Sequence, residues 1–145
     1  RVGLFLSMIM GAGLVAGCAS SGADSGLATV QLQATQINLG QTGMAVLVAK
    51  GDSTSVDFTI SGVPGGASEP LQLLSFIYPG SCASLAATPA YSMNQDTQVF
   101  PGQAGWGMSK TLPVSLATLQ ASAHAIVVRS SPADGNQNIF CGDIR

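Results

Sequence analysis

The chain has 145 residues, a formal net charge of −2 and only 8% charged residues, while glycine and small polar residues are frequent. This length fits one domain, and the composition favours an extracytoplasmic β-protein over a cytosolic helical one. Five basic residues scattered along the whole chain cannot follow a phosphate backbone, which argues against nucleic acid as a partner.

Residues 1–17 are predicted to be a secretory signal peptide, because a positive residue is followed by an apolar run and then by small residues. The run is too short and too rich in glycine for a membrane span of about 20 residues. "VAGC", residues 15–18, resembles the bacterial lipobox, which implies cleavage before Cys18 and acylation of its thiol. The acyl chains would anchor the protein in a membrane, and Ala19 in place of an aspartate implies the outer membrane. An ordinary signal peptide with a chance cysteine is the alternative.

Residues 18–27 are predicted to be the lipidated cysteine and a flexible Gly/Ser tether, and residues 28–145 the folded domain. Once Cys18 is set aside, Cys82 and Cys141 remain as an even pair in an oxidising compartment. A bridge between them would close a loop of 59 residues, worth about 4 kcal/mol in the chain-entropy model. Two free buried thiols are the alternative.

The folded domain shows a hydrophobic period of two, which is typical of half-buried strands. Two segments, 71–78 and 44–50, are more continuously apolar, as strands covered on both faces would be. Residues 115–123 are consistent with one or two helical turns. The predicted strands are residues 29–35, 44–50, 54–62, 71–78, 124–130 and 138–144. Short strands separated by Gly- and Pro-containing turns predict an all-β, antiparallel Greek-key β-barrel or sandwich.

Two segments carry a family resemblance. "LSFIYPGSC", residues 74–82, and "AHAIVVRSSPADGNQNIFCGDI", residues 123–144, together resemble the copper/zinc superoxide dismutase family, in particular its short bacterial members. The resemblance covers most of residues 28–145 and implies a superoxide dismutase-like barrel. It also implies the family's disulfide, which would join Cys82 to Cys141.

The ligand positions of that family are filled by other residues. The resemblance places Phe76 and Tyr78 on two copper-binding histidines and Arg129 on a third, and it places Asn138 on a charged guide arginine. The loop after Cys82, which brings the bridging histidine and the zinc ligands in the family, contains no histidine. Every ligand position that can be aligned is therefore degenerate.

The residue counts lead to the same expectation. The chain has one histidine, His124, which lies an odd number of positions from Arg129 and so on the opposite face of a strand. One imidazole cannot build a copper–zinc site, so neither a metal nor another cofactor is expected, and His124 is interpreted as structural or surface. Met93 and Met108 are interpreted as packing residues, with soft ligation of Cu(I) as the alternative.

Phe76, Tyr78 and Arg129 are expected to be spatial neighbours that replace the metal by packing, with Tyr91 or Trp106 in the loop 83–112 as a lid. In the alternative, the aromatics are ordinary core residues and the arginine points to water. No nucleophile elbow, carboxylate pair or phosphate loop appears. The expected function is therefore a non-enzymatic envelope lipoprotein whose degenerate domain binds a partner, not identified by the sequence, or serves a structural role. A periplasmic copper-binding protein or a residual dismutase is the alternative.

Overall fold

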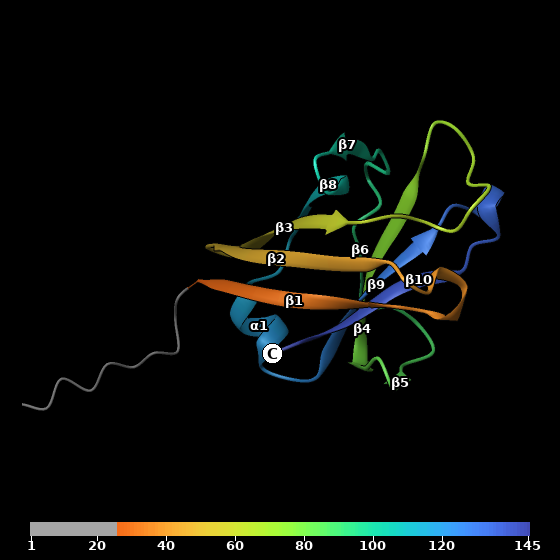
Figure 1. Ribbon diagram of the computed structural model, residues 1–145. Coiled ribbons are helices and arrows are strands. Elements are labelled where there is room, and N and C mark those ends of the chain that lie inside the picture. Colours follow the sequence, from red (N-terminus) through yellow and green to blue (C-terminus); the bar gives the residue numbers. More distant parts are fainter. Residues whose placement is uncertain (1–25) are drawn as a thin grey trace, which may run out of the picture.

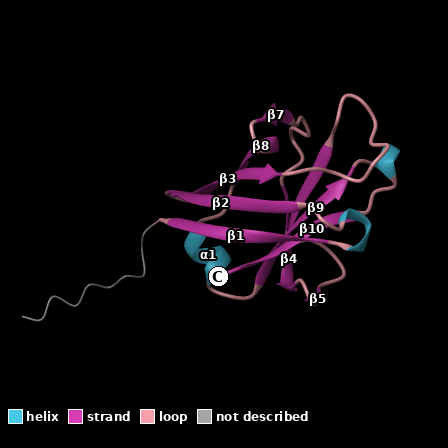
Figure 2. Cartoon of the chain, viewed as in Figure 1, coloured by secondary structure: helices cyan, strands magenta, loops and turns pink. Residues whose placement is uncertain are grey.

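The computed structural model describes residues 26–145. These residues form an antiparallel sheet of ten strands with one short helix, as predicted for an all-β protein (Figures 1 and 2). The predicted signal peptide and the lipidation of Cys18 concern residues outside this range. Within the range, no helix has the length and apolar character that crossing a bilayer requires.

Each of the six predicted segments forms a strand, whereas residues 105–112, expected within a loop, form a further long strand. The segment 44–50 is not covered on both faces as expected, because Met44 is exposed and Val46 is half-buried. The strands are β1 (Leu27–Ala34), β2 (Thr42–Lys50), β3 (Ser53–Ile60), β4 (Leu73–Ser81), β5 (Ser84–Leu85), β6 (Tyr91–Ser92), β7 (Phe100–Gly102), β8 (Gly105–Leu112), β9 (His124–Ser130) and β10 (Asn138–Ile144). The helix is α1 (Leu116–Gln120), and single 3-10 turns cover Gln36–Asn38 and Pro132–Asp134.

The strand order is β5-β4-β9-β10-β1-β2-β3-β8-β7, and β6 pairs with the free edge of β4. β1, β2 and β3 are joined by short hairpins, whereas the connections from β3 to β4 and from β8 to β9 cross between the two groups of strands. Figure 1 shows β1, β2 and β3 running across β4, β9 and β10, so the sheet folds over on itself in two layers. Among residues 26–145 no strand pairing joins its two ends, so the sheet is not closed.

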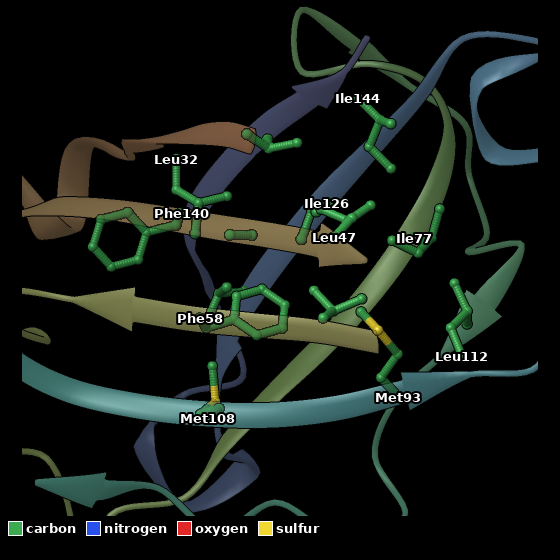
Figure 3. Close-up of a cluster of buried hydrophobic side chains, with 14 of the residues drawn as sticks. Leu32, Leu47, Phe58, Ile77, Met93, Met108, Leu112, Ile126, Phe140 and Ile144 are labelled. Atoms are coloured by element: carbon green, nitrogen blue, oxygen red, sulfur yellow. The ribbon is translucent and has the colours of Figure 1, made fainter. Parts of the chain in front are cut away.

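Side-chain alternation places one face of each layer in the core. In β1, Val30 and Leu32 are buried, whereas Thr29 and Gln31 are exposed. Figure 3 shows side chains from both layers meeting between them. The core includes Val30, Leu32, Ala45, Leu47, Val56, Phe58 and Ile60 from β1–β3, and Leu73, Ile77, Ile126, Val128, Ile139 and Phe140 from the other layer.

The open side of the sheet is bridged by the segment 91–98. The Met93 amide donates a hydrogen bond to the carbonyl of Ser75 in β4 (3.0 Å). Toward the other end of the sheet, the ammonium group of Lys110 in β8 donates to the backbone carbonyl of Asp96 in the same segment. Burial lowers the pKa of Lys110, and the nearby charge of Asp96 partly opposes that shift. Side-chain and loop contacts thus join the two ends of the sheet where a closed barrel would have a strand ladder.

The predicted helical segment is confirmed as a short capped helix. Ser115 is the N-cap of α1, and its side chain accepts a hydrogen bond from the Thr118 amide (3.2 Å). Leu116 and Leu119 are buried, so the helix covers one end of the core.

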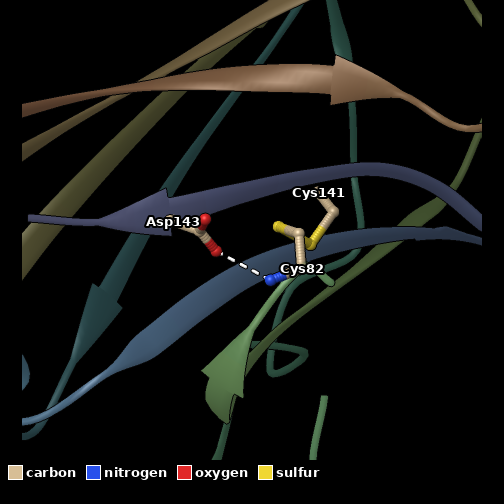
Figure 4. Close-up of a disulfide and its surroundings, with 3 residues drawn as sticks. All are labelled: Cys82, Cys141 and Asp143. Atoms are coloured by element: carbon tan, nitrogen blue, oxygen red, sulfur yellow. Dashed lines mark hydrogen bonds between the residues drawn. A yellow bond between two sulfur atoms is a disulfide. The ribbon is translucent and has the colours of Figure 1, made fainter. Parts of the chain in front are cut away.

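The predicted disulfide is also confirmed. Cys82, after the end of β4, is bonded to Cys141 in β10, with a Cα–Cα distance of 5.8 Å (Figure 4). The Cys82 amide donates to a carboxylate oxygen of Asp143 at 2.7 Å, which holds the same turn by a second link. The alternative of two free thiols is wrong.

Candidate functional site

The register of β4 and β9 brings the three predicted residues to one face. Arg129 lies opposite Leu74, and Phe76 lies opposite Val127. Because residues two apart on a strand share a face, Phe76 and Tyr78 project on the same side as Arg129. The diagonal offset between Arg129 and Phe76 is within reach of long and aromatic side chains.

The three side chains are in direct contact. The guanidinium carbon of Arg129 lies 4.7 Å from the ring centroid of Phe76 and 5.9 Å from that of Tyr78. The two rings meet edge to face, with centroids 6.2 Å apart. A guanidinium over an aromatic face contributes about 0.5–2 kcal/mol, increasing with desolvation. The alternative in which Arg129 points to water is therefore wrong.

Two hydrogen bonds fix the guanidinium in this position. Nη2 of Arg129 donates to the hydroxyl of Tyr78 at 2.6 Å, and Nε donates to Oδ1 of Asn138 at 2.8 Å. Asn138 lies directly opposite Arg129 in the β9–β10 pairing. We call these four residues (Phe76, Tyr78, Arg129 and Asn138) the Arg129 cluster.

Asn138 was not predicted to contact the arginine. The sequence marked it only as a position where the resemblance expects a charged guide residue. Its place in the cluster follows from the hairpin in which β9 and β10 pair, because that pairing sets Arg129 against Asn138. A register assigned to this hairpin would have identified the contact.

The cluster carries a fixed positive charge. Both hydrogen-bond acceptors of Arg129 are neutral, and no carboxylate in residues 26–145 forms an ion pair with it. Within the same range, no three residues of the types His, Cys, Asp and Glu lie together in a way that could hold a metal ion. The groups gathered here hold a guanidinium cation by hydrogen bonds and ring contacts.

The other candidate metal ligands lie elsewhere. His124 is at the far end of β9, opposite Pro79, and its Nδ1 is 2.9 Å from the Leu119 carbonyl oxygen. A structural His124, as expected, fits this contact. Met93 and Met108 are 4% and 1% exposed and belong to the hydrophobic core (Figure 3). The interpretation of both methionines as packing residues is confirmed.

The predicted lid is not present. Tyr91 lies opposite Ile77, and residues directly opposite on paired strands share a face, so Tyr91 is on the core side of β4. Trp106 lies opposite Ile60 and also packs against the core. The expectation that the loop 83–112 folds over the cluster is wrong, because its second half forms β7 and β8 at the other end of the sheet.

A separate electrostatic contact ties two loops together. Asp134 accepts hydrogen bonds from the amide and the hydroxyl of Ser68, at 2.9 and 2.6 Å. These bonds, with a third from Ser131, lower the pKa of Asp134. A cavity of about 280 Å³ lies between the same loops, and it is lined mainly by apolar residues.

Comparison with protein families finds no match to this chain. Comparisons with curated proteins and with solved structures also find none.

Proposed function

We propose that residues 28–145 are a superoxide dismutase-like domain that has lost its metal site and serves a bacterial envelope lipoprotein as a binding or structural module. The strand order supports this proposal. The order β4-β9-β10-β1-β2-β3-β8, with its two connections that cross between layers, is compatible with a Greek-key sandwich derived from a barrel.

The observation that carries the proposal is the Arg129 cluster. The resemblance expects three copper-binding histidines at positions 76, 78 and 129. The side chains at these positions are in contact with one another, as converging ligands would be, but they bring a cation and two aromatic rings. A fixed guanidinium repels a copper ion by simple electrostatics and supplies no lone pair for it. On this basis the cluster takes over the packing role of the metal.

The cell location rests on the disulfide and on the predicted lipobox. A structural disulfide favours an extracytoplasmic compartment. Acylation of Cys18 would attach the domain to the membrane, and Ala19 favours the outer one. Mass spectrometry of the protein from membrane fractions tests this part: an unmodified Cys18, or an intact residue 1–17 segment, would contradict it.

A copper-binding protein is the second candidate, and it has weaker support. It would need soft ligands from Met93 and Met108 or an imidazole from His124. Both thioethers are packed in the core, and Nδ1 of the histidine contacts a backbone carbonyl. Copper binding through the two methionines would require the core to open, and the half-buried His124 offers a single imidazole.

A triple histidine variant tests the proposal directly. The variant F76H/Y78H/R129H places three imidazoles where the resemblance expects copper ligands. We expect it to bind one Cu(II) with nitrogen hyperfine structure in its electron paramagnetic resonance spectrum, whereas the wild-type protein binds none in calorimetric titration. The matched control F76A/Y78A/R129A removes the same cluster without adding imidazoles and must not bind.

Each outcome separates the parts of the proposal. Stoichiometric copper in the wild-type protein, or superoxide dismutation by it, would contradict a lost metal site. A folded triple histidine variant that does not bind copper would instead contradict the dismutase-like placement of these positions. Circular dichroism and the melting temperature establish that each variant is folded.

A further inference from the structure

One row of residues crosses the outer face of the sheet on strands other than those that carry the Arg129 cluster. The strand registers pair Gln31 of β1 with Met44 of β2, Met44 with Thr59 of β3, Thr59 with Gly107 of β8, and Gly107 with Phe100 of β7. Paired residues share a face, so all five lie in one line. With strands about 4.8 Å apart, the row spans about 19 Å.

The row is the floor of a groove. A cavity of about 370 Å³ lies around Phe100 and the hairpin tip between β7 and β8, and a second cavity of about 180 Å³ lies over β1 and β2. Thr59 and Ala104 line both cavities, so the two lie next to each other along the row. Together they form a shallow, elongated depression that crosses several strands.

Phe100 forms an aromatic platform at one end of this groove. Its side chain is 52% exposed, so much of the ring is open to solvent. Its ring lies against Gly107, where an added Cβ atom would come within 2.6 Å of Cε2. The glycine therefore lets the ring lie close over β8, and the short hairpin holds it there.

The polar groups in the groove are mostly neutral. Asp57 accepts a hydrogen bond from the Ser109 hydroxyl through Oδ1 at 2.6 Å, and its Oδ2 has no hydrogen-bond partner within residues 26–145. The remaining polar side chains along the groove carry hydroxyls or amides: Gln31, Thr42, Thr59, Ser61 and Gln103. Neither cavity is lined by lysine or arginine, and the single charge is negative, so an anionic ligand is disfavoured.

We propose that this groove binds an uncharged oligosaccharide. A sugar ring presents a face of C–H groups, which are attracted to the negative π face of an exposed aromatic ring. Its hydroxyls would donate to the free carboxylate oxygen of Asp57 and exchange hydrogen bonds with the amide and hydroxyl side chains along the floor. An elongated neutral chain of several sugars matches the length of the row. The groove lies outside the Arg129 cluster, so this proposal stands independently of the loss of the metal site.

Titration with neutral tetrasaccharides tests the proposal. The purified protein would be titrated with β-1,4-linked tetramers of glucose, mannose and N-acetylglucosamine, by calorimetry and by amide chemical-shift mapping. We expect at least one of them to bind with a Kd below about 1 mM and to shift residues along the row. F100A is expected to weaken binding about tenfold, and D57N to weaken it as well.

The control variant L39A removes an apolar side chain that is 67% exposed but lies outside the groove, and it should bind like the wild type. The proposal is overturned if none of the three tetramers binds at about 10 mM, or if F100A and D57N both bind like the wild type. Shifts confined to another face, or equal affinity for the acidic tetramer of galacturonate, would overturn it as well.

Discussion

Removal of the Cys82–Cys141 disulfide should destabilise the domain strongly. The double variant C82S/C141S releases a cross-link across 59 positions of the chain. In the chain-entropy model, a loop of this size restricts the unfolded state by about 14 cal/mol/K, which is about 4 kcal/mol at 25 °C. This is a large share of the 5–15 kcal/mol that is typical of a folded domain.

Urea denaturation of the wild-type and double-variant proteins measures this difference, with the free energy of unfolding extrapolated to water. For a domain of this size, about 4 kcal/mol corresponds to a melting temperature lower by roughly 15 °C. Reduction of the wild-type protein should reproduce most of the loss. The variant D143N, which weakens only the second link to Cys82, is the matched control and should cost no more than about 1 kcal/mol. A loss below about 1 kcal/mol in C82S/C141S would refute the reasoning, since the unfolded chain would then gain little freedom.

Three further predictions concern single positions. The hydroxyl of Ser75 is buried and has no hydrogen-bond partner among residues 26–145, so S75A should raise the free energy of unfolding by about 1 kcal/mol in urea denaturation; a destabilised variant would contradict this. A Cβ atom on Gly142 would lie 2.5 Å from the backbone oxygen of Gln31, so G142A should cost about 1–3 kcal/mol, whereas G65A, which points into open space, should be nearly neutral. The lowered pKa of Asp134 means that its contribution to stability is complete above the ordinary value of 3.8 and is lost as the pH falls through the lowered one. D134N should therefore be less stable than the wild type at pH 7, and this gap should close at acidic pH; a gap independent of pH would exclude the linkage.

Strand alternation predicted most of the fold. It missed β8, which was expected to be part of the loop 83–112, and the reason is physical. The core face of β8 carries Met108, Lys110 and Leu112, so a buried lysine interrupts the apolar pattern at its centre. The strand also begins with glycines, which are poor strand formers. The lysine is tolerated because its ammonium group reaches the carbonyl of Asp96, and such a long-range partner is invisible in the sequence.

The contact between Arg129 and Tyr78 was predicted because the resemblance supplied a long-range alignment of two strands. Within each strand, parity alone was then sufficient to put both side chains on one face. The prediction of a lid was wrong because nothing in the sequence determined how the segment of Tyr91 pairs. Tyr91 belongs to a strand of two residues, whose register no periodicity could determine, and a shift by one position exchanges the two faces.

The open sheet has a consequence for association between copies. A free strand edge exposes unpaired amide and carbonyl groups and invites another chain to pair with it. Here the outermost strands, β5, β6 and β7, have only two or three residues each, and β7 contains Pro101, which lacks an amide donor. The segment 91–98 covers much of the remaining edge of β4. Strands this short offer little template for edge-to-edge pairing, and the longer edge is that of β8 over residues 108–112, beyond its pairing with β7.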